Sequence, residues 1–134
     1  MRKFYAEIEK LDDNEIKIIG YRIRGSGSLS YYEDNPIIIY KDHIPWIIET
    51  LKAKTKKDYY EEWTDTVTLN DLYKLFLGIT INRGGISHLD LVTNWFIRRE
   101  DSKTLTIPYS DYNDLMESIT PFISLLEDFV KKSS

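Results

Sequence analysis

Two histidines limit the acid–base chemistry that this chain could perform near neutral pH. His88 and Asp90 have the spacing of strand residues whose side chains share a face, so the two could pair. Such a pair orients a catalytic base only where a nucleophile lies nearby, and no Gly-x-Ser-x-Gly, Ser-x-x-Lys or His-Glu-x-x-His motif marks one. His43 follows Asp42 at an expected helix start, where we predict a surface position. We therefore expect neither a catalytic nor a metal site, and rank an enzyme below a binding protein.

Glycine-rich turns and adjacent carboxylates are the other groups that could do chemistry. The segments 25–27 and 83–85 could offer backbone N–H groups to a phosphate, but neither has Walker or dinucleotide-binding spacing, and hairpin turns explain both. Most of the acidic pairs fall in predicted turns, where solvated carboxylates are ordinary. These pairs are Asp12–Asp13, Glu33–Asp34, Glu61–Glu62 and Glu100–Asp101. Cysteine is absent, which excludes disulfides and thiolate-bound metals, and we expect no cofactor.

Length and charge describe a globular chain without a dedicated basic region. The 134 residues are 42% apolar and 30% charged, which suits one folded domain over 1–134. The net charge of −4 is spread evenly, because the first 67 residues and the last 67 each contribute −2. This balance disfavours a nucleic-acid partner, although a local basic patch can outweigh it. Charge appears immediately after Met1, with no apolar signal segment or membrane span, so we expect a cytoplasmic protein without a membrane partner.

The first half has a strand-rich pattern that ends in a helix. Alternation of apolar and polar residues predicts strands over 3–9, over 15–24, around Tyr31 and over 37–40. Leu11–Asn14 and the glycines at 25–27 supply turns between them. Asp42 is the expected N-cap of a helix that carries Ile44, Ile47, Ile48 and Leu51 at helical spacing.

The second half is predicted to end in the same way. Thr68 and Asp71 have capping-box spacing ahead of Leu72 and Leu75, which predicts a short helix. Strands are expected over 78–82, 88–99 and 104–109, with turns at 83–85 and 100–103. Asp111 is the expected cap of a final helix through Val130, which Pro121 either kinks or restarts.

Both halves end with an apolar strand, the pattern Tyr-x-Asp and an amphipathic helix. This similarity favours two related halves, 1–57 and 66–132, although any strand–cap–helix junction uses these residue types. We predict an α+β fold, mainly antiparallel sheet with three or four helices packed on one face, built from two fused strand-strand-helix repeats. The predicted order of elements resembles that of single-stranded nucleic-acid binders of the whirly and PUR types. No motif of those families matches here, so the resemblance implies the fold alone.

An acidic and aromatic run near the middle of the chain is the first candidate binding site. Four carboxylates within it could steer the protein toward a basic surface, and its aromatic residues could anchor an interface. A solvated connector between the halves is the alternative explanation. The candidate residues are Asp58, Tyr59, Tyr60, Glu61, Glu62, Trp63 and Asp65.

Arginine and aromatic residues on two predicted strands form the second candidate site. Stacking on aromatic rings together with phosphate contacts can hold a single strand of nucleic acid. The same residue types anchor protein interfaces, and they also fill ordinary cores and ion pairs. The candidate residues are Tyr21, Arg22, Arg24, Trp95, Arg98 and Arg99.

These patterns favour a small, acidic, intracellular protein-binding module of the inhibitor, immunity or anti-defence type. The net charge, the acidic run and the lack of a catalytic motif support this expectation. The alternative is a single-stranded nucleic-acid binder that uses the arginine- and aromatic-bearing strands. Open sheet edges could also pair two copies of the chain in a homodimer.

Overall fold

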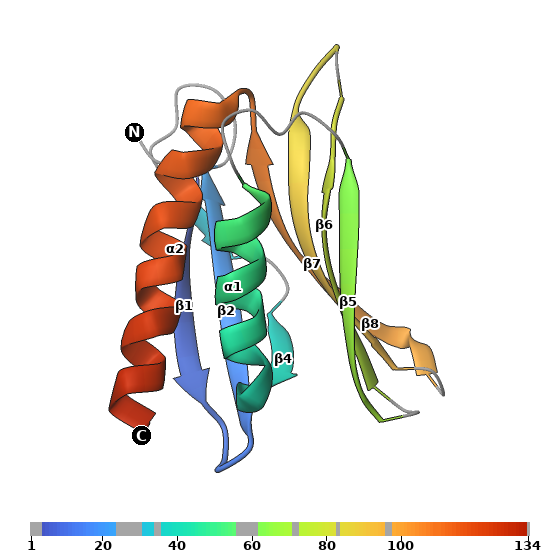
Figure 1. Cartoon of the computed structure of the whole chain (residues 1–134), viewed down its shortest axis with the longest axis vertical. Helices are drawn as coiled ribbons and strands as arrows, with labels where there is room; N and C mark the ends of the chain where they lie inside the picture. Colours follow the sequence, from blue (N-terminus) through green and yellow to red (C-terminus); the bar gives the residue numbers. More distant parts are fainter. Residues whose placement is uncertain are drawn as a thin grey trace.

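The computed structural model describes residues 4–23, 31–33, 36–55, 62–70, 73–82, 84–95 and 98–133. Two antiparallel sheets and two long helices make up this part of the chain (Figure 1). Each sheet precedes one of the helices in the sequence. The α+β class with antiparallel sheets and helices packed against a sheet is thereby confirmed.

The first sheet, which we call sheet A, contains β1 (Phe4–Lys10), β2 (Glu15–Ile23), β3 (Tyr31–Glu33) and β4 (Ile37–Tyr40). Strand β2 lies in the middle, with β1 along one edge and both β3 and β4 along the other. The predicted turn between β1 and β2 is confirmed, because Asp12 Oδ1 accepts hydrogen bonds from the backbone N–H groups of Asn14 and Glu15, each at 2.7 Å. This arrangement fixes which residues of β1 and β2 face each other.

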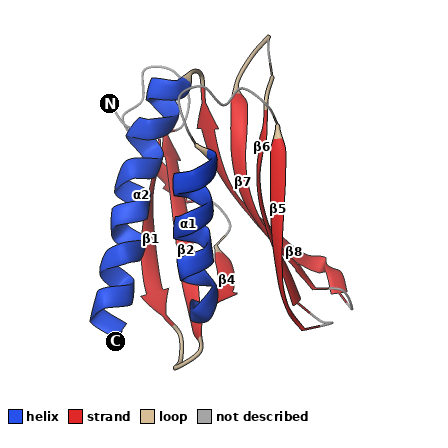
Figure 2. Ribbon diagram, viewed as in Figure 1, coloured by secondary structure: helices blue, strands red, loops and turns tan. Residues whose placement is uncertain are grey.

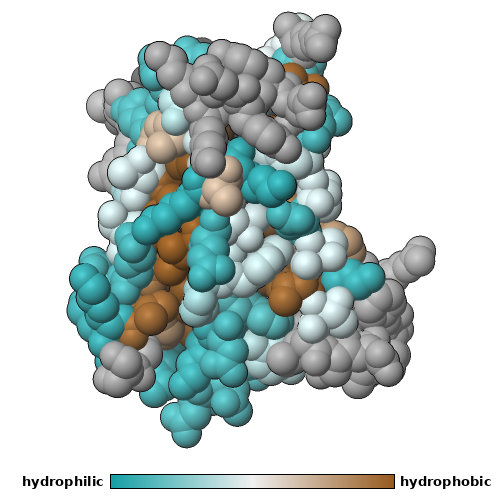
Figure 3. Space-filling view, in the orientation of Figure 1, coloured by the Kyte–Doolittle hydropathy of each residue, from teal (hydrophilic) through white to brown (hydrophobic). Residues whose placement is uncertain are grey.

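Both long helices lie on the same face of sheet A (Figure 2). They are α1 (Ile44–Lys54), which follows the short 3₁₀ turn η1 (Lys41–His43), and α2 (Tyr112–Ser133). Lys52 of α1 and Glu127 of α2 form an ion pair of 3.1 Å between the helices. Figure 3 views this side, where a hydrophobic stripe over the helices is framed by hydrophilic residues. No helix in the described ranges is long and apolar enough to cross a membrane.

The second sheet, sheet B, contains β5 (Trp63–Asn70), β6 (Tyr73–Thr80), β7 (Ser87–Trp95) and β8 (Arg98–Tyr109), in that order. Its inner face and the helix side of sheet A share one hydrophobic core. The two sheets approach closely at Gly20, because a Cβ atom added there would lie 2.5 Å from Leu105 Cδ1 and 3.0 Å from the Phe4 ring. Buried residues from both sheets and both helices include Ile16, Ile37, Leu51, Leu77, Leu89 and Leu126.

The short helix predicted from Thr68 and Asp71 is wrong. Thr68 lies in β5, and Leu75 lies in β6, so the segment forms two strands instead. Leu75, Leu77 and Ile79 alternate into the core, where β7 pairs with them. Long-range pairing across β6 therefore overrides the local capping pattern.

The hairpin turn predicted at 100–103 is also wrong. These residues belong to β8, and the pairing of β7 with β8 continues to Trp95 and Arg98. A register shift between Thr93 and Trp95 accompanies the extension. Polar residues are compatible with this part of the hairpin, since the backbone hydrogen bonds of a strand pair do not require apolar side chains.

The two predicted helix caps have different outcomes. Asp111 caps α2 as expected: its Oδ1 accepts a hydrogen bond of 2.8 Å from the backbone N–H of Asp114. Asp42 does not cap α1, because it lies within η1 and the helix begins after His43 without a side-chain cap. Pro121 lies inside a continuous α2. The two halves each place four strands before a helix, and their origin by duplication stays a prediction.

Candidate functional site

The face of sheet A opposite the helices carries the most distinctive exposed chemistry in the described structure. Alternation along β1 and β2 sends Phe4, Ile16 and Ile18 into the core, so their sequence neighbours point to the other side. We call this other side the open face. Its described residues include Tyr5, Glu7, Glu9, Glu15, Lys17, Ile19, Tyr21 and Ile38.

Two tyrosines lie together on the open face. Tyr5 and Tyr21 are directly paired across β1 and β2, and their rings stack with centroids 4.6 Å apart and planes 11° apart. The Tyr21 hydroxyl donates a hydrogen bond of 3.3 Å to Glu7 Oε2. The stack and this bond restrict the ring positions, so the pair is a preorganised aromatic surface.

Charged and aliphatic side chains surround the tyrosines. Lys17 forms an ion pair of 3.2 Å with Glu9, and Glu7 and Glu15 add two further carboxylates. Ile38, which pairs with Lys17 across β2 and β4, is 41% exposed, an unusual exposure for an isoleucine in a strand. The open face therefore combines apolar area with an excess of negative charge.

The acidic and aromatic run is described only from Glu62 onward; Asp58, Tyr59, Tyr60 and Glu61 lie outside the described residues. Glu62 is exposed, and its Oε1 accepts a hydrogen bond of 2.9 Å from the backbone N–H of Ile81. Trp63 is only 8% exposed and belongs to the hydrophobic core, while Asp65 is half-buried on the same side of β5. In this structure the Trp63 indole thus packs inside the protein.

The arginine and aromatic candidates are distributed over different places. Tyr21 lies on the open face, whereas Arg22 lies on the opposite face beside Phe4, half-buried and with its Nε shielded from solvent. Arg24 lies outside the described residues. For Trp95, Arg98 and Arg99 the structure places the backbone in the far part of the β7–β8 hairpin. Tyr21 and Arg22 therefore cannot contact the same strand of nucleic acid on one sheet face.

His88 and Asp90 do not form the hydrogen-bonded pair that their spacing in the sequence allows. His88 and Asp90 share the outer face of sheet B, but the Asp90 carboxylate accepts a hydrogen bond of 2.7 Å from the Thr106 hydroxyl. His43 is 6% exposed and packs edge-on against the Tyr40 ring, so the prediction of a surface position is wrong. Burial lowers the pKa of His43, and the nearby Asp42 carboxylate opposes that shift. The described ranges contain no cluster of three or more metal-ligating side chains.

The outer face of sheet B is a second open surface, which sequence reasoning missed. It displays a row of threonines along β5 and places the Lys74 ammonium 5.7 Å from the centre of the Phe76 ring. The signal was the alternation of threonine in Trp63–Asn70, which indicates a strand with one solvated face. Exposed threonines on this sheet are Thr64, Thr66, Thr68, Thr80 and Thr104.

No protein-family model, curated protein or solved structure matches this chain. The candidate site is therefore defined by the geometry of the chain's own side chains.

Proposed function

We propose that this protein is a non-enzymatic binding module of the inhibitor, immunity or anti-defence type, which docks onto a protein partner through the open face. The observation that carries the proposal is the stacked pair Tyr5–Tyr21 on a sheet face that neither helix covers. Tyrosine supplies large contact area at low conformational cost and is enriched among residues that dominate binding energy. A pair already fixed in place loses little further freedom when a partner binds.

The charge of the open face favours a basic partner. Glu7, Glu9 and Glu15 surround the apolar residues, and Lys17 is the one basic group among the described residues of this face. Carboxylates at the rim of an interface accelerate encounter with a positive surface more than they add to final affinity. Two copies of the same face would bring like charges together, so the open face suits a different, basic protein better than a second copy of this chain.

The proposal is tested by affinity purification with matched baits, followed by measurement of binding to each purified partner. The baits are the unchanged chain, the double variant Tyr5→Ala/Tyr21→Ala, the single variant Ile38→Arg, and Thr66→Ala on sheet B as the control. Ile38 is 41% exposed, so an arginine there should repel a basic partner without disturbing the core. We expect a partner whose affinity falls about 30-fold or more with the tyrosine pair removed, the equivalent of a loss of about 2 kcal/mol.

Raising the salt concentration should slow association of the unchanged chain with its partner, since exposed charges are screened. Thr66→Ala should bind as the unchanged chain does. Equal affinity of the unchanged chain, the tyrosine double variant and Ile38→Arg for every purified partner would refute docking through the open face.

Single-stranded nucleic acid is the second candidate ligand, and the outer face of sheet B is the surface that favours it. Lys74 and the half-buried Phe76 ring bring a cation and an aromatic group together, the two kinds of group that hold phosphates and unpaired bases. We test it by titrating labelled single-stranded DNA and RNA at low and near-physiological salt. Binding that weakens with salt and with Lys74→Ala supports this candidate; no binding at low salt excludes it.

A further inference from the structure

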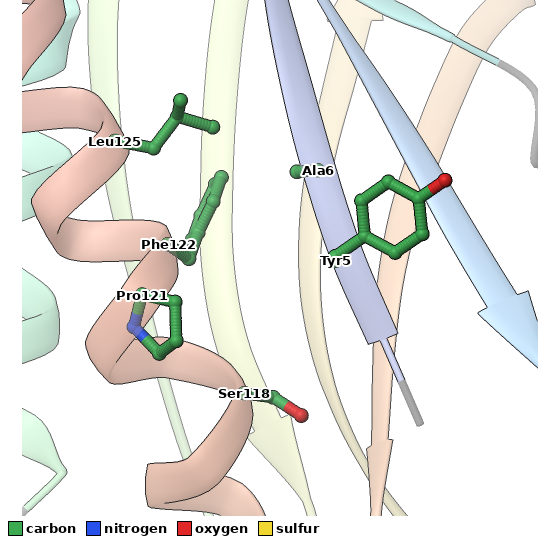
Figure 4. Close-up of a pocket in the computed structure, with 6 residues that line it drawn as sticks. All are labelled: Tyr5, Ala6, Ser118, Pro121, Phe122 and Leu125. Carbon is green, nitrogen blue, oxygen red and sulfur yellow. The ribbon is translucent and has the colours of Figure 1, made fainter. Parts of the chain in front are cut away.

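A pocket of about 230 Å³ lies between helix α2 and strand β1 (Figure 4). Four of its lining residues come from α2 and face the strand; the other two are neighbours on β1. The lining residues are Tyr5, Ala6, Ser118, Pro121, Phe122 and Leu125. Neither the candidate docking contact nor the hydrophobic core accounts for this space.

The pocket exists because a small residue occupies the helix side of β1. Phe4, Ala6 and Ile8 alternate toward α2, and the Phe4 ring meets Phe122 edge-on with centroids 6.4 Å apart. Between the large side chains of Phe4 and Ile8, the single methyl group of Ala6 fills less of the space beneath α2. Figure 4 shows Ala6 pointing toward the helix, whereas the neighbouring Tyr5 ring points to the other side of the strand.

One polar group in the pocket, the Ser118 hydroxyl, has no hydrogen-bond partner among the described residues. Ser118 is 2% exposed, and its Oγ makes no hydrogen bond within the described part of the chain. Figure 4 shows the Ser118 side chain directed from α2 toward β1. A buried hydroxyl without a partner carries a desolvation penalty, which a hydrogen bond from a bound molecule would relieve.

The lining sets the class of ligand. Among the described lining residues there is no lysine, arginine, aspartate or glutamate, so they offer a charged ligand no opposite charge in exchange for its hydration. A cavity of roughly 150 Å³ lined by apolar side chains binds benzene, and this pocket is larger. The Phe122 ring, Pro121 and Leu125 supply apolar walls suited to a flat ring.

We propose that this pocket binds a small neutral molecule built on one aromatic ring and carrying one hydroxyl or carbonyl group, which pairs with the Ser118 hydroxyl. This inference does not depend on the proposed docking function. Tyr5 contributes both to the pocket and to the open face, so the variants that test the pocket leave Tyr5 unchanged.

Benzyl alcohol and toluene are the matched probes, because they share a ring and differ in the hydroxyl group. Each is titrated into the isotope-labelled full chain, and amide chemical shifts are followed by NMR. We expect saturable shifts centred on Ala6, Phe122 and Leu125. In Ser118→Ala the ratio of the benzyl alcohol affinity to the toluene affinity should fall about tenfold, the value of one net hydrogen bond.

Two further variants separate pocket binding from general effects. Ala6→Leu fills the pocket and should abolish binding of both probes. If that variant does not fold, Ala6→Val fills part of the pocket with a smaller residue that favours strands and should also weaken binding of both probes. Ser124→Ala changes an exposed serine on the same helix and should leave both affinities unchanged. Absence of saturable shifts for both probes, or unchanged binding in a folded Ala6 variant, would overturn the proposal. An unchanged affinity ratio in Ser118→Ala would overturn the role given to the hydroxyl.

Discussion

Tyr5 and Tyr21 stack almost parallel across β1 and β2, with ring centroids 4.6 Å apart, on the sheet face that the helices leave uncovered. The pair is partly sheltered, because each ring covers the other and the Tyr21 hydroxyl bonds to Glu7. Stacking therefore contributes to the fold as well as to the candidate binding surface. The contribution of the pair to stability can therefore be measured in the isolated protein, before any partner is known.

The coupling between the two rings can be measured with a double-mutant cycle. We expect Tyr5→Ala and Tyr21→Ala to show an interaction energy of about 0.5–1.5 kcal/mol in urea unfolding, the value of an aromatic pair beyond its buried area. The control combines Tyr5→Ala with Thr66→Ala on the other sheet, where the two effects should add. If the losses of stability in the two tyrosine variants simply add in the double variant, the stacking of the rings contributes no stability of its own.

Gly20 should tolerate no larger side chain, because Leu105 of β8 packs directly against it. Replacement by alanine places a methyl group 2.5 Å from Leu105 Cδ1, and Leu105 is itself buried. We expect Gly20→Ala to lower the free energy of unfolding by about 1–3 kcal/mol, as overpacking does in cores. Adding Leu105→Val should recover part of the loss in thermal or urea unfolding. If Leu105→Val lowers the stability of the Gly20→Ala variant further, the two side chains do not compete for the same space.

The two candidate helix caps should respond differently to the same substitution. Asp111→Ala removes the hydrogen bond from the Asp114 backbone and should cost about 1 kcal/mol of stability. Asp42→Ala removes an exposed carboxylate that caps no helix, so its effect should stay within about 0.5 kcal/mol at pH 7.5. Urea unfolding of both variants under one condition makes the comparison. Equal losses would contradict the assignment of Asp111 as the cap.

Stability should fall as the pH is lowered through the range in which histidine titrates. Burial lowers the pKa of His43 below its ordinary value of 6.5, so the unfolded chain binds the proton more readily than the folded protein. The free energy of unfolding should therefore decrease from about pH 6.5 down to the lowered pKa of the folded state, with no contribution from this residue above that range. His43→Leu should flatten this part of the urea-midpoint profile. A slope that persists unchanged in that variant would assign it to other groups.

The alternation of apolar and polar residues was sufficient to predict β1, β2 and β4, and apolar residues at helical spacing were sufficient to predict the helix that ends each half. It was also sufficient to place Tyr21 and Arg22 on opposite faces, because successive strand residues always point to opposite sides. The cap at Asp111 could be predicted for a similar reason: the residue lies within one helical turn of the N–H group that it satisfies. Each of these features depends on residues close together in the chain.

Features that depend on distant residues were predicted wrongly or were missed. Thr68 and Asp71 have the spacing of a helix start, yet Thr68 lies in β5, which pairs with β6, and β6 pairs in turn with β7. The charged residues at 100–103 resemble a turn, yet they lie within β8, which pairs with β7 at Lys103 and again at Arg98. Trp63 stands in an acidic, exposed-looking run, and only the packing of sheet B against sheet A shows that its indole is buried.

The sequence by itself determined the class of fold, the two faces of each strand and the local helix start at Asp111, since these follow from the geometry of neighbouring residues. Only the tertiary structure decided that Tyr5 meets Tyr21, that Leu105 fills the space above Gly20, and that Ala6 leaves a pocket beneath α2. Such contacts depend on strand register and on the approach of elements far apart in the chain, which is set by how the whole core packs.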